Sequence, residues 1–532
     1  MKVLTAETMA AVDRRAIEEI GLPGAVLMEN AAIGLADAIG ERFPGAEAVA
    51  IFCGPGNNGG DGLALGRHLA IRGYRLALCL WTGGRELAGD AAMQHAVCSR
   101  QGLNVRRIAS DDDASRALAE AATCDLVVDA LFGTGLSRPL EGLPATLVRG
   151  INHLPSPRLA VDLPSGLNGG RHQVFGPAVR AEVTVALGAL KVPHVLEPAA
   201  ERVGEVVLAD LGIPPALLAE APSELELLTA DDLAPSLAPR RPESHKGTYG
   251  HVLIVAGSPG KAGAAVLAAR AAVRGGAGLV TVAVPRELLT AVDLGSVESM
   301  TLPLHSTPIG ELSPQGAEAV LEACRDRDLL ALGPGLGTTL GEGGEALAAT
   351  VRRIALAVPL PLVLDADGLN AFAGRCEELA ARSLPTVLTP HPGELGRLLG
   401  ISTAEVQEDR PAAARRVAEA SGALVVLKGH RTLIANPDGA LAVCSAGNPG
   451  MATGGTGDVL TGLLAALLAH REGEGDDPFA ADPGLSRRVA LAVYLHALAG
   501  DEAAARRGEA SLAAGDLVET LPAAWKALED GR

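Results

Sequence analysis

Short apolar stretches alternate with longer amphipathic stretches in the first part of the chain. After a helix-like segment at 5–40, strand-like runs occur at 48–53, 75–81, 125–131, 158–163 and 182–187. The segments between them carry the apolar spacing of helices, as at 63–72, 89–100 and 113–122. Strands and helices that alternate in this way predict a parallel sheet covered by helices on both faces.

A second alternating series follows a proline-rich stretch. Proline comes directly after Ile213, Ala221, Ala234, Ala238 and Arg241, where no strand pattern is visible. Strand-like runs then return at 251–256, 279–284, 328–332, 360–364, 386–389 and 424–427. Prolines at this density favour a connector between two domains. Since an alternating series of strands and helices stands on each side of it, we predict an α/β protein of two tandem three-layer domains. The domains are residues 1–215 and 246–532, and the connector is 216–245.

The composition narrows the class of protein. The chain has 532 residues, 48% of them hydrophobic and 20% charged, which is typical of globular domains. Its net charge of -18 argues against nucleic acid or an anionic membrane as a partner. No apolar run approaches the ~20 residues of a membrane span, and the N-terminus lacks the apolar core of a signal peptide. Seven dispersed cysteines without a C-x-x-C pair indicate reduced core residues, so we expect a cytoplasmic protein.

The most informative segment is the glycine-rich stretch 447–458, which leads directly into an apolar helical run. Glycine N–H groups and a helix N-terminus together form a site suited to phosphate. Asp458, at the start of this helix, is poorly placed to bind phosphate but well placed to take a proton from an attacking hydroxyl. The alternative is that Asp458 only caps the helix.

Three loops at strand ends in the first domain, 54–62, 129–141 and 162–168, are rich in glycine and polar residues. Ligands of open α/β sheets bind where such loops meet. The first loop matches the G-x-G-x-x-G dinucleotide fingerprint, but no acid ends the second strand to hold a ribose. Asn58, Asp129 and Ser165 offer oxygen ligands that suit a hard cation. Each of the three, taken singly, could instead cap the next helix.

Loops of the second domain add further candidates. The loop at 257–263 is not a Walker A sequence, because alanine follows Lys261 and the spacing is wrong. Asp365 and Asp367 follow a strand, where they could orient water around Mg²⁺ or cap a helix. His391 stands between two prolines on a turn and is therefore not packed into a helix face.

Lys428 and Thr432 follow the strand at 424–427, where they could contact the phosphates of a nucleotide. Asp458 would then be the base, and the amides of 454–457 would hold the developing negative charge. Together these residues predict phosphoryl transfer from a nucleotide to a hydroxyl, achieved mainly by positioning and electrostatics.

The motifs of both domains resemble those of known families. The second domain is similar to the ribokinase-like superfamily, and within it to ADP-dependent NAD(P)H-hydrate dehydratases, through Gly333–Gly337, Leu388–Glu394, Lys428–Thr432 and Gly447–Asp458. The first domain resembles the NAD(P)H-hydrate epimerases, which we expect to be Rossmann-like, through Asn57–Asp61, Asp129–Pro139 and Asp162–Gly166. Their order matches the family of bifunctional NAD(P)H-hydrate repair enzymes. The connector and an insertion at 472–485 have no motif to compare.

The resemblance implies roles for particular residues. In the epimerase half, the hydrated dinucleotide is bound by Asn57, Asn58, Gly59, Gly60, Asp61, Gly133, Thr134, Gly135, Leu136, Ser137, Arg138, Pro139 and Asp162. Asp162 is the expected acid/base, and K⁺ is held by Asn58, Asp129 and Ser165. In the dehydratase half, the hydrate faces Ala264, Gly335, His391 and the catalytic Asp458. ADP, accompanied by Mg²⁺, is held by Lys428, Gly429, His430, Arg431, Thr432 and Gly457.

The implied activity is the repair of NADH and NADPH to which water has added, the hydrates NADHX and NADPHX. One half interconverts the R and S hydrates. In the other, Asp458 deprotonates the ring hydroxyl, which attacks the terminal phosphate of ADP; loss of phosphate then restores NAD(P)H and leaves AMP. The resemblance also implies a homo-oligomer. The alternatives are a ribokinase-type small-molecule kinase fused to a ligand-binding domain, a silent nucleotide sensor and an NAD-dependent dehydrogenase.

Overall fold

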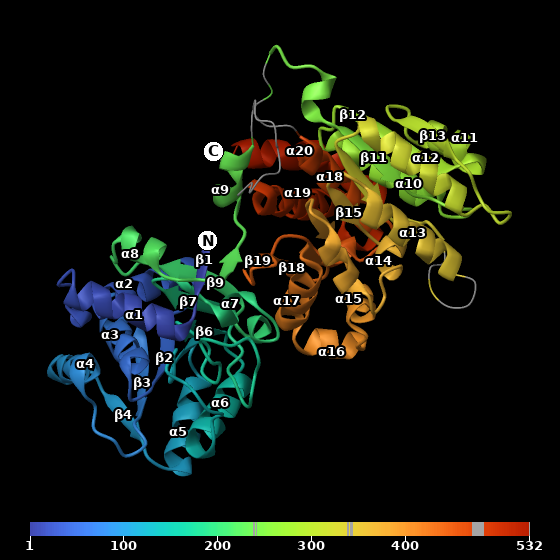
Figure 1. The fold of residues 1–532 in the computed structure, drawn as a ribbon. Helices are drawn as coiled ribbons and strands as arrows, with labels where there is room; N and C mark the ends of the chain where they lie inside the picture. Colours follow the sequence, from blue (N-terminus) through green and yellow to red (C-terminus); the bar gives the residue numbers. More distant parts are fainter. Residues whose placement is uncertain (238–239, 241, 338–339, 341–343, 471–483, 531–532) are drawn as a thin grey trace. The chain divides into compact units, whose positions relative to one another are not determined.

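The computed structural model describes residues 1–237, 240, 242–337, 340, 344–470 and 484–530. Residues 238, 239 and 241 of the predicted connector lie outside the described residues, as do 471–483, most of the predicted insertion. The chain divides into two compact units, residues 2–225 and residues 226–532 together with Met1. Each unit has its own largely parallel sheet, which confirms the predicted class of two α/β domains (Figure 1).

The first domain is built on a seven-stranded parallel sheet in the order β4-β3-β2-β5-β6-β7-β9. A separate parallel pair joins β1 to β8. The elements are β1 Lys2–Leu4, α1 Ala6–Glu18, α2 Gly24–Arg42, β2 Ala48–Cys53, α3 Asn57–Ile71, β3 Arg75–Trp81, α4 Gly89–Arg100, β4 Val105–Ile108, α5 Asp111–Ala121, β5 Leu126–Ala130, α6 Gly142–His153, β6 Arg158–Val161, β7 Val183–Leu187, β8 Leu190–Lys191, α7 Val192–Val195, β9 Glu205–Ala209 and α8 Pro215–Glu220.

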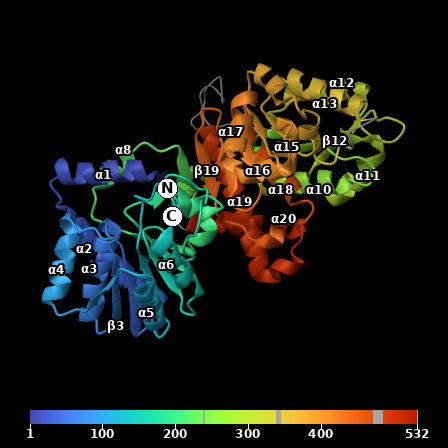
Figure 2. The ribbon, with the colours of Figure 1, turned by 90° about the horizontal axis from the view of Figure 1, so that it is seen from below.

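Helices cover both faces of this sheet. Side chains alternate between the two faces along β2, and since the whole strand is buried, both faces must be covered. Val49, Ile51 and Cys53 pack into the core shared with α1 to α4. Ala50 and Phe52 pack into the core formed with α5 and α6. Figures 1 and 2 show the two helical layers on either side of the strands. Both faces being covered, ligands can reach the sheet only at its ends.

The second domain contains strands in the order β13-β12-β11-β14-β15-β16-β17-β18-β19, parallel up to β17 and antiparallel from β17 to β19. The elements from residue 225 onward are β10 Leu225–Leu227, α9 Ala230–Leu233, β11 His251–Val255, α10 Ala262–Arg274, β12 Leu279–Pro285, α11 Leu289–Gly295, β13 Met300–Leu304, α12 Pro314–Ala323, β14 Leu329–Leu332, α13 Glu345–Ala357, β15 Leu362–Leu364, α14 Asp367–Asn370, β16 Thr386–Leu388, α15 Pro392–Leu399, α16 Thr403–Glu408, α17 Arg410–Ser421, β17 Leu424–Leu427, β18 Thr432–Ala435, β19 Leu441–Cys444, α18 Thr456–Ala469, α19 Gly484–Arg507 and α20 Ala514–Asp530.

Helix α18 is the central element of the second domain. Every residue from Val459 to Ala469 is buried, because α10, α19 and α20 pack around it against one face of the sheet. A helix that is apolar on all sides requires such full enclosure. Its backbone approaches α10 so closely that a Cβ on Gly462 would lie 2.0 Å from the carbonyl oxygen of Ala268. This packing fixes the position of the N-terminal end of α18, where Asp458 lies.

The segment predicted as a loop at 54–62 is largely helical. Helix α3 begins at Asn57, so Asn57 to Asp61 form its first turns. A Cβ on Gly59 would lie 1.9 Å from the carbonyl oxygen of Gly54, and one on Gly60 would lie 2.6 Å from the Met28 side chain. The glycines therefore allow close packing rather than a wide turn. Sequence patterns miss this because the same residue type serves both purposes.

The stretch predicted as a connector contributes to both domains. Leu217 and Ala221 are buried in the core of the first domain. Leu228, Leu233 and other residues up to Leu237 are buried in the core of the second. The prolines that mark this stretch thus interrupt secondary structure without preventing burial. Among the described helices, none is both long and apolar enough to cross a membrane.

Candidate functional sites

The strand-end loops of the first domain line one cavity of about 910 Å³. The predicted residues that line it are Asn57, Asn58, Asp61, Gly133, Thr134, Gly135, Leu136, Ser137, Arg138 and Asp162. Gly59 and Gly60 pack inside the domain instead, and Pro139 lines a neighbouring cavity of about 520 Å³. The structure therefore brings most of the predicted epimerase residues to one hollow, and their roles stay predictions.

Asp162 is held in a strained conformation at the wall of this cavity. Its φ of 62° lies in the left-handed region, which a residue with a side chain rarely adopts. Lys191, only 1% exposed, forms an ion pair with its carboxylate, and the backbone N–H of Leu187 donates to Oδ1 at 3.0 Å. The carbonyl of Asp162 lies 2.7 Å from Nε2 of His194. A strained backbone conformation that is stabilised by surrounding contacts, as at Asp162, is typical of functional sites.

Two further carboxyl groups that line the same cavity, those of Asp13 and Asp61, have raised pKa values. Burial raises the pKa of Asp13 to about 6, with Lys191 opposing and Asp162 adding to the shift. Burial also raises the pKa of Asp61 well above its usual value, and Asp162 and Asp13 contribute. One oxygen of Asp13, Oδ1, is buried without a hydrogen-bond partner among the described residues. The cavity can therefore hold protonated as well as ionised carboxyl groups near neutral pH.

The three predicted K⁺ ligands lie next to this cavity. Asp129 is completely buried, and its carboxylate accepts hydrogen bonds from the backbone N–H and hydroxyl of Ser165 at 2.7 and 2.6 Å. Burial raises the pKa of Asp129 to about 6. Asn58 approaches Gly133 closely, with Oδ1 the nearest atom, and its Nδ2 has no hydrogen-bond partner among the described residues. A buried carboxylate whose hydrogen-bond donors are all neutral can accept a monovalent cation, to which Asn58 could contribute its amide oxygen but not its N–H group.

In the second domain, Asp458 is the third residue of α18 and is not its N-cap, which is Gly455 with a φ of 96°. The interpretation of Asp458 as an N-cap is therefore wrong. Burial raises its pKa to about 7; Asp365 adds to the shift, and Lys428 opposes it. A carboxyl group with this pKa can take up a proton at neutral pH, which is what a general base requires.

Lys428 lies at the centre of a charged cluster beside Asp458. Its ammonium is 2.8 Å from Oδ1 of Asp365 and 3.8 Å from Oε2 of Glu394. Thr461 donates to the other oxygen of Asp365 at 2.8 Å. Burial lowers the pKa of Lys428, but the two carboxylates outweigh burial and the net pKa is raised, so the ammonium stays charged. A Cβ on Gly457 would lie 3.3 Å from this ammonium, so the start of α18 and the lysine face one anion position.

His391 caps helix α15, where its Nδ1 accepts hydrogen bonds from the N–H groups of Gly393 and Glu394 at 3.0 and 3.3 Å. Burial lowers the pKa of His391, with the positive charge of Lys428 contributing. The imidazole is therefore neutral at pH 7. Gly335 and Ala264, predicted to face the hydrate, lie side by side: a Cβ on Gly335 would be 3.1 Å from that of Ala264.

A cavity of about 540 Å³ contains all of the predicted nucleotide residues, Lys428, Gly429, His430, Arg431, Thr432 and Gly457. It is also lined by residues that sequence patterns do not single out, among them Val493, His496 and Ala497. Burial lowers the pKa of His496 to about 4, and its Nε2 lies 2.9 Å from the carbonyl of Thr456. The imidazole ring of His496 is thus uncharged, lines the cavity and is held by the carbonyl of Thr456, the first residue of α18. The size and partly apolar lining suit a nucleoside.

The charged partners in both sites are what sequence reasoning leaves unassigned. Lys191 and Asp13 come from β8 and α1, far in sequence from Asp162, and neither stands in a recognisable motif. The sequence places Asp365 at a strand end, but its pairing with Lys428 and Thr461 depends on the sheet order. The described non-glycine residues with positive φ are Asp162, Ala366 and Arg431, each at or beside a site.

The second domain, with a carboxyl group of raised pKa at a helix N-terminus beside a cavity of nucleotide size, defines a ribokinase-like class of enzyme. Family models agree: residues 252–523 match the NAD(P)H-hydrate dehydratase model, and residues 24–192 match the model called YjeF-related protein N-terminus.

Similar proteins extend over the whole chain. The bifunctional NAD(P)H-hydrate repair enzyme Nnr of Moorella thermoacetica is 42% identical over 533 residues, which cover 100% of this chain and 98% of the relative. The same-named protein of Thermofilum pendens is 39% identical and covers 100% and 97%. The crystal structure of the ADP/ATP-dependent NAD(P)H-hydrate dehydratase from Bacillus subtilis, co-crystallised with ATP/Mg²⁺, is 31% identical with a TM-score of 0.46, covering 57% of this chain and 99% of that one. The chain belongs to the family of bifunctional NAD(P)H-hydrate repair enzymes.

Proposed function

We propose that the chain repairs hydrated NADH and NADPH in two steps. The first domain epimerises the R and S hydrates, and the second dehydrates the S hydrate with ADP to give NAD(P)H, AMP and phosphate. The dehydratase half of the proposal depends mainly on the carboxyl group of Asp458. This group has a raised pKa of about 7 and lies beside the nucleotide cavity and the ammonium of Lys428. The experiment that tests it supplies the hydrate mixture with ADP and follows the return of nicotinamide absorbance together with phosphate release.

In the dehydratase half, the ring hydroxyl of the hydrate donates its proton to Asp458, and its oxygen attacks the terminal phosphorus of ADP, displacing AMP. The phosphorylated ring carbon then loses phosphate while a proton leaves the adjacent carbon, so that the ring double bond returns. The amides at the start of α18 and the ammonium of Lys428 stabilise negative charge on the transferred phosphoryl group. Mg²⁺ would neutralise the phosphates of ADP.

In the epimerase half, Asp162 is the proposed acid/base at the hydrated carbon. Water adds to this carbon because it is bonded to the ring nitrogen, whose lone pair can later expel the hydroxyl as water once a proton is supplied. Readdition of water on the opposite face inverts the carbon. Asp162 fits this role because Lys191 and the N–H of Leu187 fix its carboxylate at the cavity wall.

The dehydration rate is expected to rise with pH up to about 7 and then level off. Asp458 accepts a proton only when it is ionised, and its pKa is about 7. Below that pH, kcat/KM should fall about tenfold per pH unit. The measurement is the initial rate of NAD(P)H formation from the S hydrate and ADP between pH 5 and pH 9. A profile that is flat across pH 7 would contradict the role of Asp458.

Epimerisation is expected to require K⁺, held by Asn58, Asp129 and Ser165. When bound, K⁺ would compensate the buried charge of Asp129 and keep Asn58 in place at the start of α3. Exchanging K⁺ for Li⁺, which is too small for this ligand set, should lower the epimerisation rate about 10-fold or more. Asp129→Asn should remove the dependence together with most of the activity. Equal rates in the two salts would argue against the site.

We further propose that the epimerase activity resides in residues 1–215 and the dehydratase activity in residues 246–532, and that the protein works in the cytoplasm as a homo-oligomer. All seven cysteines are free and six are buried, which favours a reducing compartment. Exposed Ile17, Ile20 and Ile33 on and next to α1 and α2 are suited to an interface. Light scattering of the full chain gives the oligomeric state.

A further inference from the structure

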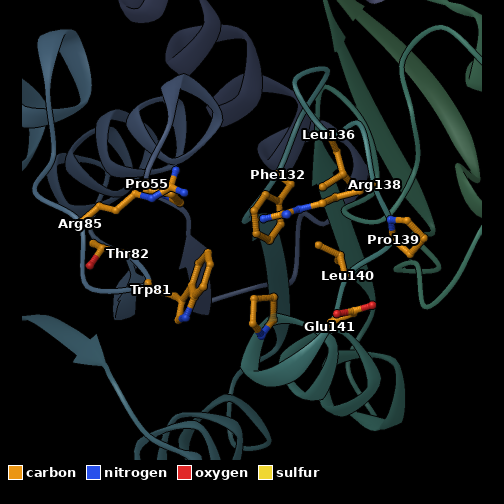
Figure 3. A pocket seen from close by; sticks show the side chains of 12 residues that line it. Pro55, Trp81, Thr82, Arg85, Phe132, Leu136, Arg138, Pro139, Leu140 and Glu141 are labelled. Carbon is orange, nitrogen blue, oxygen red and sulfur yellow. The ribbon is translucent and has the colours of Figure 1, made fainter.

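A second cavity adjoins the epimerase cavity in the first domain. Its volume is about 520 Å³, and its lining includes Trp81, Thr82, Pro144 and Glu141. Pro55, Arg85, Phe132, Leu136 and Arg138 line both cavities, so the second hollow lies beside the first and shares part of its wall. Figure 3 shows the aromatic side chains of Trp81 and Phe132 facing this hollow, with the two arginines above.

The sheet order explains why these side chains meet. Trp81 is the last residue of β3, Pro55 follows β2, and Phe132 follows β5, and these strands are neighbours in the order β3-β2-β5. Their carboxyl ends therefore bring two aromatic rings together, with centroids 5.5 Å apart and an angle of 55° between the rings. Flat apolar walls of this kind suit a stacked heterocyclic base.

The two arginines that line both cavities carry guanidinium groups without a partner among the described residues. Among the described residues, no hydrogen bond or ion pair involves the side chain of Arg85 or that of Arg138, whereas arginines such as Arg67 and Arg158 pair with glutamates. In a chain of net charge -18, two unpaired guanidinium groups at one cavity border are well suited to recognise phosphate. The carboxylate of Glu141, also in the lining, can accept hydrogen bonds from ribose hydroxyls.

We infer that this second cavity binds the adenosine half of the hydrated dinucleotide, with adenine between Trp81 and Pro144 and the pyrophosphate at Arg85 and Arg138. The inference rests on the proposed epimerase function. Asp162 lines only the first cavity, so the hydrated ring lies there, and the residues shared by both cavities lie where the two halves of a dinucleotide are joined. The junction of such a molecule is its pyrophosphate, which is common to NADHX and NADPHX.

Steady-state epimerisation by the full chain tests the role of Arg85. Arg85→Ala should raise KM about 10- to 100-fold for both NADHX and NADPHX and leave kcat within about threefold, because it removes binding that is the same in ground and transition states. Dehydration of the S hydrate by the same variant reports on intact protein. Arg107→Ala, an exposed arginine of β4 outside both linings, is the matched control and should leave KM unchanged.

An unchanged KM in Arg85→Ala, with wild-type chain epimerising normally, would overturn the inference while leaving the proposed function standing. An effect confined to NADPHX would place the 2′-phosphate, not the pyrophosphate, at Arg85 and would also overturn it. Absence of epimerisation by wild-type chain would instead refute the proposed function.

Direct binding gives an independent measurement without catalysis. The chain has two tryptophans, Trp81 and Trp525. In Trp525→Phe, the remaining fluorescence reports on Trp81 alone, even though the second domain also binds nucleotides. ADP-ribose, which lacks the nicotinamide ring, should quench this fluorescence saturably, and adding Arg85→Ala should weaken its binding about 10-fold or more. Fluorescence that does not respond to ADP-ribose would overturn the placement of adenine at Trp81.

Discussion

Asp458→Asn is expected to lower the dehydration rate about 10²- to 10⁴-fold, because an amide keeps the size of the side chain but cannot accept the proton of the ring hydroxyl. The protein should remain folded. The raised pKa of about 7 means that the site disfavours the ionised carboxyl group, so a neutral amide is tolerated there. Epimerisation in the first domain should continue at the wild-type rate.

Formation of NAD(P)H from the S hydrate with saturating ADP measures the first effect, and loss of the R hydrate by chromatography measures the second. Asp293→Asn, an exposed aspartate of α11 in the same domain, is the control for a change of one charge. Dehydration by Asp458→Asn at a rate near that of Asp293→Asn would refute the role of Asp458 as base.

Asp162→Asn is expected to have the opposite pattern. Epimerisation should fall about 10²- to 10⁴-fold, and dehydration of the S hydrate should not change. The variant also leaves the buried ammonium of Lys191 without its counter-charge, which should destabilise the first domain by about 3–5 kcal/mol. Thermal or denaturant unfolding, followed together with both activities, separates the loss of chemistry from the loss of stability.

A double variant, Asp162→Asn with Lys191→Met, distinguishes these two effects. Removing the unpaired charge should recover much of the lost stability, while epimerisation stays low because the acid/base group is still missing. Recovery of epimerisation in the double variant would show that Asp162 serves only to neutralise Lys191. Mixing Asp162→Asn with Asp458→Asn should restore full conversion of the R hydrate, since each protein then supplies the activity that the other lacks.

The first domain shows what patterns along the chain can predict. The strand-like runs at 48–53 and 75–81 coincide with β2 and β3. Buried parallel strands are nearly continuous apolar runs, so they can be recognised without knowing which strands lie beside them. Strands β4 and β9 were not predicted. They lie at the two edges of the sheet, where part of each strand is exposed, so their apolar signal is weak.

The sites show a similar division. Glycine-rich loops and their single acids, Asp458 and Asp162, were identified from the sequence because a phosphate cradle and a strand-end acid depend on local residues. The charged groups beside these two acids, which fix Asp162 in place and adjust the pKa of Asp458, were not assigned to them from the sequence. Lys428 was expected to hold phosphate, and the structure adds its pairing with Asp365 across two strands.

The sequence by itself determined that this chain is two tandem α/β domains, which motifs they carry and which family they resemble, because periodicity and loop composition are properties of neighbouring residues. Only the tertiary structure decided that Asn57 to Asp61 lie in a helix, that Lys191 neutralises Asp162, and that two adjacent cavities share Arg85 and Arg138. These features depend on which strands lie side by side and on how deeply charges are buried. Both follow from packing between segments that are far apart in the chain.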